Sequence, residues 1–134
     1  MPMALLLVAA CTGGGPRPAA VAPAAPPAFG APGADVHAGM GPGEQGWHLR
    51  AALNVAALSC GRRNPALVAS YNRMLARQRQ PLAAAYAAEV ARSQRQPGAW
   101  QPQLDLHLTR LYNYYAWPPA QAGFCAAAAP VATE

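Results

Sequence analysis

The chain of 134 residues has no lysine and few charges of either sign. Charged residues make up only 11% of it, and all ten basic residues are arginines. The formal charge of +5 therefore describes a weak positive field rather than a polybasic patch. Because Arg, Ala, Pro and Gly all have GC-rich codons, base composition explains the missing lysine as well as any need for guanidinium groups does. We draw no functional conclusion from it.

Motifs that carry enzyme chemistry are also missing. The sequence has no G-x-S-x-G, no H-E-x-x-H and no glycine-rich phosphate loop before a helix. Within the expected domain the carboxylates are Glu89 and Asp105, one on each of two helices, and isolated carboxylates on helices are usually solvated. We therefore name no catalytic residue and expect a protein that is not an enzyme.

The three histidines do not predict a metal site. His107 and Asp105 lie two residues apart on an expected helix and point to different sides, whereas ligands at i and i+4 share one face. His48 opens the first expected helix, and His37 precedes it. We expect surface or capping histidines, no metal site and no cofactor.

The sequence has only three cysteines, and in an exported protein an odd number leaves one of them without a disulfide partner. Cys11 follows an uncharged apolar run from Met3 to Ala10, which is long enough for the apolar region of a secretory signal and too short to span a bilayer. The residues from Leu7 to Cys11 resemble the lipobox of bacterial lipoproteins, in which small residues precede a cysteine that is diacylated and becomes the new N-terminus. The resemblance implies a signal peptide at residues 1–10 and lipidation of Cys11.

Lipidation of Cys11 would account for the odd cysteine. Cys60 and Cys125 would then be free to form one disulfide in an oxidising periplasm. In lipoproteins generally, a residue other than Asp after the lipidated cysteine favours the outer membrane, and Thr12 fits that rule. The expected location is the periplasmic face of the outer or inner membrane, held by the lipid anchor, where nucleic acid is not an expected partner.

Other interpretations of the N-terminus stay open. No Lys or Arg precedes the apolar run, whereas a secretory signal normally carries a positive segment there, and a start codon assigned too late would explain its absence. The stretch could also be an Ala-rich N-terminus that ends in an ordinary cysteine. A signal peptide cleaved further along the chain is a third possibility.

A low-complexity segment follows Cys11. Pro and Gly supply 16 of the 35 residues from Thr12 to Gly46, which is typical of a disordered segment with too few large apolar groups to order it. We predict a disordered tether at residues 11–46, a helical domain at residues 47–129 and a frayed tail at residues 130–134.

Apolar residues at helical spacing predict an all-α domain, a small bundle of about four helices with one disulfide. A first helix runs from Trp47 to Cys60, and Gly61 in the left-handed conformation closes it. Asn64 as N-cap and Pro65 at the first helical position start a second helix. The inward positions of these two helices are Leu49, Leu53, Ala56, Cys60, Leu67, Tyr71, Met74 and Leu75.

The apolar positions of the second helix continue at helical spacing beyond Pro81, at Leu82, Tyr86 and Val90. We therefore predict one long helix kinked near Arg77, or two nearly collinear helices. A turn at Pro97 and Gly98 separates them from a helix that starts near Pro102 and ends before Pro118 and Pro119. The remaining inward positions are Leu104, Leu108, Leu111, Tyr112, Tyr115 and, on a short last helix, Phe124 and Cys125.

One stretch, from Arg110 to Trp117, is rich in aromatic side chains. These either fill the core or form a surface platform that binds a partner or stacks on a sugar. The residues that we assign to this possible binding surface are Arg110, Asn113, Tyr114, Trp117, Arg73 and Arg77.

The domain resembles small, uncharacterised exported proteins of GC-rich alphaproteobacteria. The segments that carry the resemblance are ALNVAALSC, LVASYNRMLARQ and TRLYNYYAWPPAQAGFC, and together they cover most of residues 49–129. The resemblance transfers no catalytic residue. We expect a lipid-anchored envelope protein that acts by binding or by a structural role, with an envelope protein or a cell-wall polymer as partner. The alternative is a soluble periplasmic module that binds an acidic or glycan ligand.

Overall fold

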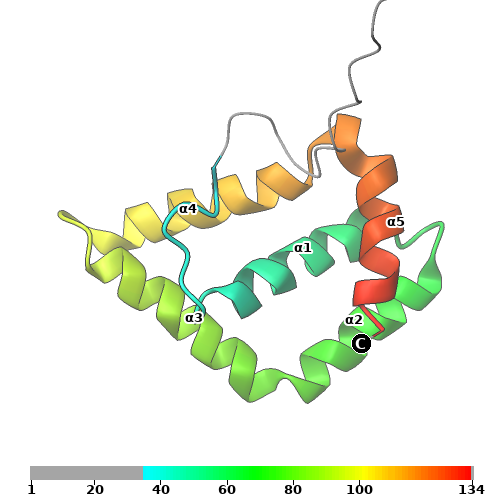
Figure 1. The fold of residues 1–134 in the computed structure, drawn as a ribbon, viewed down its shortest axis with the longest axis horizontal. Helices are drawn as coiled ribbons and strands as arrows, with labels where there is room; N and C mark the ends of the chain where they lie inside the picture. Colours follow the sequence, from blue (N-terminus) through cyan, green and yellow to red (C-terminus); the bar gives the residue numbers. More distant parts are fainter. Residues whose placement is uncertain (1–34, 134) are drawn as a thin grey trace, which may run out of the picture.

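A computed structural model describes residues 35–133, which fold into helices around one central helix. The elements are α1 (Gln45–Cys60), α2 (Pro65–Arg77), α3 (Arg79–Gln94), α4 (Trp100–Tyr115), a 3₁₀ turn (Pro118–Ala120) and α5 (Gln121–Val131). α1 contacts each of the four other α-helices and lies inside the frame that they form (Figure 1). The described residues contain no strand, which confirms the all-α prediction, with five α-helices in place of about four.

The helix boundaries follow the local sequence signals, with one exception. Asn64 caps α2, since its Oδ1 accepts a hydrogen bond from the backbone N–H of Leu67 at 3.3 Å, and Gly98 has the positive φ that the turn before α4 needs. The left-handed conformation predicted for Gly61 is wrong, because its φ is −59°. Gly61 instead provides space, since a Cβ there would lie 2.6 Å from Cγ2 of Val68 on α2.

The second predicted helix is in fact two helices that are not collinear. The chain leaves helical geometry at Gln78, and α2 and α3 meet there at a sharp angle (Figure 1). Pro81 is the third residue of α3, where the backbone N–H has no partner within the helix, so the proline interrupts no hydrogen bond. The break lies next to Arg77, where the kink was predicted, but it separates two helices, and the nearly collinear arrangement is wrong.

The bend gives α3 an inner face that differs from the predicted one. Its buried residues are Ala85, Glu89 and Ser93, whereas Tyr86 is 39% exposed. Small side chains let α3 approach the start of α1 closely, and a Cβ on Gly46 would lie only 3.3 Å from that of Ala85. The predicted inward position Tyr86 is thus wrong, Leu82 and Val90 are only half-buried, and the fully buried face of α3 is small and polar.

The bend also leaves a groove beside the first half of α1. Leu49 is 49% exposed there, contrary to the prediction, and shares the groove with Leu53, Met74 and Leu82. Gln78, between the end of α2 and the start of α3, lines the same groove, so the groove lies at the junction of these two helices.

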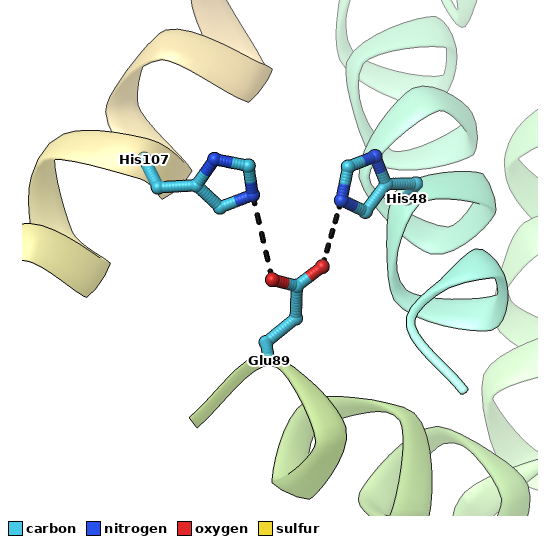
Figure 2. Close-up of side chains that lie close together, drawn as sticks. All are labelled: His48, Glu89 and His107. Atoms are coloured by element: carbon cyan, nitrogen blue, oxygen red, sulfur yellow. Dashed lines mark ion pairs between the residues drawn. The ribbon is translucent and has the colours of Figure 1, made fainter. Parts of the chain in front are cut away.

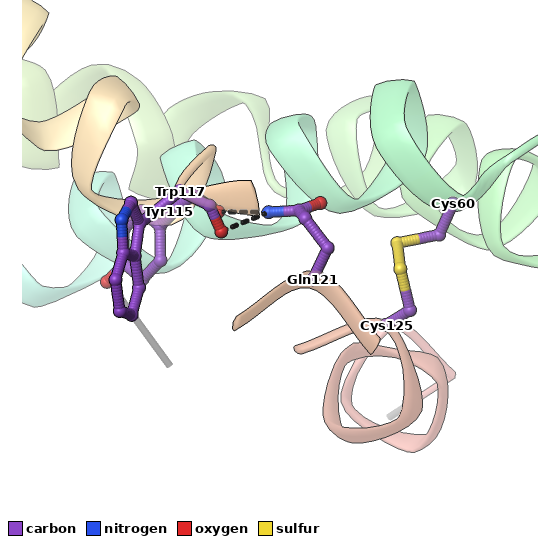
Figure 3. Close-up of a disulfide and its surroundings, with 5 residues drawn as sticks. All are labelled: Cys60, Tyr115, Trp117, Gln121 and Cys125. Atoms are coloured by element: carbon purple, nitrogen blue, oxygen red, sulfur yellow. Dashed lines mark hydrogen bonds between the residues drawn. A yellow bond between two sulfur atoms is a disulfide. The ribbon is translucent and has the colours of Figure 1, made fainter. Parts of the chain in front are cut away.

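An apolar core fills the space between the second half of α1, α2 and α5. Cys60, at the last position of α1, forms the predicted disulfide with Cys125 of α5, and Figure 3 shows this bond. Gln121 holds the start of α5 by donating from Nε2 to the backbone oxygens of Tyr115 at 2.8 Å and Trp117 at 3.4 Å. The buried residues of this core are Leu53, Val55, Ala56, Cys60, Leu67, Tyr71, Phe124, Ala128 and Ala132.

The folded part extends beyond both predicted domain boundaries. Residues 35–44 lie against the domain, where Val36 and Glu44 are buried, and the segment runs from α4 to the start of α1 (Figure 1). At the other end α5 continues to Val131, and Ala132 belongs to the core. Residues 35–46 of the predicted tether therefore belong to the folded domain, and the predicted tail is largely folded. The predicted signal peptide, Cys11 and residues 12–34 lie outside the described residues.

Bilayer crossing needs a long apolar helix, and none of the helices within residues 35–133 has both the length and the composition for it.

Candidate functional site

Three helices bring one carboxylate and two imidazoles together near the start of α1. Glu89 of α3 places Oε1 at 2.7 Å from Nε2 of His48 on α1, and Oε2 at 3.4 Å from Nε2 of His107 on α4. Figure 2 shows both rings turning their Nε2 atoms toward the carboxylate. We call these three residues the His–Glu cluster.

The His–Glu cluster is enclosed by protein. Glu89 is 0% exposed and His48 is 2% exposed, while the side chain of His107 is 20% exposed and forms the open edge. Neither Nε2 atom and neither carboxylate oxygen has a hydrogen-bond partner among the described residues outside the cluster. Because a buried polar atom without a partner costs free energy, these four atoms depend on one another or on a bound ion.

A second layer of polar groups supports His48. Its Nδ1 lies 2.8 Å from Nδ1 of His37, and Nε2 of His37 lies 3.4 Å from the hydroxyl of Tyr115. The ring of Tyr114 meets His37 edge-on at 5.5 Å between centroids. A chain of contacts therefore runs from Glu89 through His48 and His37 to Tyr115.

Electrostatics keeps Glu89 ionised. Burial alone would raise the pKa of Glu89, but the contacts with His107 and His48 and their positive charge together lower it to about 2. Arg92 adds a more distant charge, with Nη1 at 3.9 Å from Oε2, while its Nη2 donates to the backbone oxygen of Ala38. The cluster thus holds a buried carboxylate that requires a positive partner at neutral pH.

The neighbours of the cluster stay neutral. Burial, assisted by the charge of His48, lowers the pKa of His37. Burial also raises the pKa of Tyr115 to about 12, so its hydroxyl keeps its proton. Two imidazole nitrogens and a carboxylate, backed by neutral hydrogen-bonding groups, are able to bind a divalent cation or to share protons.

The sequence interpretation missed this site. The expectation that Glu89 is solvated is wrong, as is the expectation that His48 is a surface or capping residue, whereas Asp105 is exposed. The sequence did contain one signal for it: Glu89 lies four residues from Ala85 and from Ser93, so the three share one face of α3. It had little weight because small and polar residues also line solvated helix faces.

The residues assigned to the possible binding surface do not share one face. Arg110 and Asn113 of α4 are exposed, Trp117 is partly buried, and Tyr114 packs against Tyr115 as well as His37. Arg73 and Arg77 are exposed on α2, and α1 lies between α2 and α4 (Figure 1). The two sets therefore form two separate surfaces.

Comparisons with known proteins give no assignment: no family model matches the chain, and neither the curated proteins nor the solved structures contain a significant match.

Proposed function

We propose that this protein is exported and lipid-anchored, and that it has a non-catalytic binding or structural role in the cell envelope. The observation that carries the proposal is the pairing of Cys60 with Cys125. Disulfides persist in oxidising compartments such as the bacterial periplasm and are rare in the cytosol. The pairing also leaves Cys11 as the one cysteine of the sequence outside this disulfide, which supports its assignment as the lipidated residue.

A lipid anchor at Cys11 would attach the domain stably and leave it room to stand off the membrane. Several acyl chains on one cysteine give stable attachment, where a single chain binds only marginally. Between Cys11 and the first described residue, Asp35, the chain has enough length to hold the domain away from the bilayer. An envelope protein or an anionic cell-wall polymer is then the proposed partner, consistent with the formal charge of +5.

The soluble binding module is the less favoured proposal. Its proposed ligand would contact the aromatic residues of α4 and the arginines of α2 together, and the fold separates them. The exposed pair Arg110 and Asn113 could still meet an acidic partner.

The test is the intact mass of the mature protein from its native membrane fraction, measured with and without reductant. We expect a chain that begins at Cys11 with added acyl mass and that gains the mass of two hydrogen atoms on reduction. The matched control is Cys11→Ala, which should lose the acyl mass and keep the disulfide. A wild-type chain that retains Met1 and has three free thiols would overturn the proposal.

A further inference from the structure

We propose that His48, Glu89 and His107 bind a divalent transition metal ion, with zinc as the preferred ion. Three separate helices supply the ligands, and the candidate ligand atoms all lie within 4.8 Å of one another. The inference goes beyond the proposed envelope function, because it assigns a specific ion and a specific site to the domain.

The distances are close to those around a tetrahedral ion. Zinc lies about 2.0–2.2 Å from imidazole nitrogen and carboxylate oxygen, so neighbouring ligand atoms in a tetrahedron are roughly 3.3 Å apart. The contact between Glu89 and His107, at 3.4 Å, has this spacing, while the 2.7 Å contact with His48 has the length of a direct ion pair and lengthens when an ion enters between the two groups. The two histidine rings have centroids 5.4 Å apart, so small rotations of side chains bring their nitrogens to the required spacing.

Burial and charge favour a cation over hydrogen bonds alone. Glu89 is fully buried, and beyond the two histidines the nearest positive group is Arg92 at 3.9 Å, too far for a hydrogen bond. Protonated histidines can also neutralise a carboxylate, but each supplies one N–H to a group with four acceptor sites. A divalent ion satisfies both nitrogens and the carboxylate at once.

The second layer has the arrangement that metal-bound histidines need. A ligating histidine normally donates its other ring N–H to an acceptor, which fixes the ring and its tautomer. For His48 that partner is His37, which is itself in contact with Tyr115. His37 is therefore a positioning residue that acts through His48.

The ligand set also indicates which ions are excluded. Calcium and magnesium prefer six or more oxygen ligands, whereas imidazole suits zinc and its transition-metal neighbours. His107 is the most accessible member of the cluster, with its side chain 20% exposed, so the ion would enter at that edge.

The experiment is a titration of the full mature chain, purified without a polyhistidine tag and stripped with a chelator. We expect one equivalent of Zn²⁺ to bind by calorimetry, and Co²⁺ to give the visible absorption of tetrahedral coordination. Ca²⁺ and Mg²⁺ should give no signal. His107→Ala, at the exposed edge, should weaken zinc binding at least 100-fold, while Asp105→Asn on the same helix should change nothing.

Three further variants test the details. Glu89→Gln should abolish binding, and His37→Ala should weaken it about 10- to 100-fold through the orientation of His48. Arg92→Gln should tighten binding by removing a neighbouring positive charge. If the wild type binds no Zn²⁺ at millimolar concentration, or if His107→Ala binds as well as the wild type, the cluster is an ion-paired structural group only and the proposal fails.

Discussion

The two halves of α1 lie in environments of opposite character. Around the second half, apolar residues of α1, α2 and α5 form the core that the Cys60–Cys125 bridge closes. Around the first half, α3 contributes small residues and the Glu89 carboxylate, and α4 contributes His107, while His48 lies on α1 itself. The second half is held by apolar packing and a covalent bond, and the first half adds charge and hydrogen bonding to a smaller apolar cluster of Val36, Ala51 and Leu111. Loss of the disulfide should therefore destabilise mainly the surroundings of the second half, and loss of a buried charge mainly those of the first half.

Removal of the disulfide should have the largest effect. Replacing Cys60 and Cys125 together with serine releases a loop with a sequence separation of 65. The chain-entropy model gives a loss of about 4 kcal/mol for such a loop, which is close to the whole stability of a small domain. Urea unfolding of the double variant should show this loss. A change below about 1 kcal/mol would contradict the role given to the bridge.

Loss of the buried carboxylate should be nearly as damaging. Glu89→Gln keeps the size of the side chain but removes the charge that pairs with His48 and His107. Breaking a buried ion pair on one side costs about 3 kcal/mol or more. Urea unfolding at pH 7 measures the loss, with Glu44→Gln as the control at a second buried carboxylate whose charged contact, Arg95, is 4.0 Å away. Equal losses in both variants would contradict the special role of Glu89.

Acid should weaken the polar half. The folded state lowers the pKa of Glu89 from 4.5 to about 2, so its stabilisation is complete above pH 4.5 and is lost as the pH falls toward 2. The lowered pKa of His37 acts in the same direction as the pH falls below 6.5. The free energy of unfolding should drop by about 3 kcal/mol between pH 4.5 and 2, and Glu89→Gln should lack that drop. An unchanged acid profile in the variant would contradict this assignment.

Loss of a helix cap in the apolar half should have the smallest effect. Asn64→Ala removes the acceptor for the N–H of Leu67 at the start of α2, at a cost of about 1 kcal/mol. Thermal unfolding should show a lower Tm for Asn64→Ala, while Asn64→Ser should recover most of it. Equal Tm values for the alanine variant and the wild type would show that the cap contributes nothing.

The apolar half was predictable because its sequence signals are strong. Leu53, Ala56 and Cys60 repeat at helical spacing, and all three are buried as expected. Asn64 followed by Pro65 marks a helix start by backbone chemistry alone, and the structure confirms it. The disulfide followed from the number of cysteines once Cys11 was assigned to the anchor.

In the polar half the inward positions Leu104 and Leu111 of α4 are confirmed, but the His–Glu cluster was not predictable because it depends on single polar side chains from three helices. Periodicity favoured Leu82, Tyr86 and Val90 as the inner face of α3, and the bend at Gln78 turns Glu89 inward instead. The direction of that bend depends on contacts between helices that are distant in sequence. For the same reason nothing in the sequence indicated that His48 and His107 would meet at one carboxylate.

Amide hydrogen exchange, followed separately in α3 and α4 and in α2 and α5, tests the division of the domain most directly. The account predicts that reduction of the disulfide speeds exchange mainly in α5 and α2, and that Glu89→Gln speeds it mainly in α3 and α4. If both changes accelerate exchange equally in all four helices, the domain is one cooperative unit and the division into an apolar and a polar half is wrong.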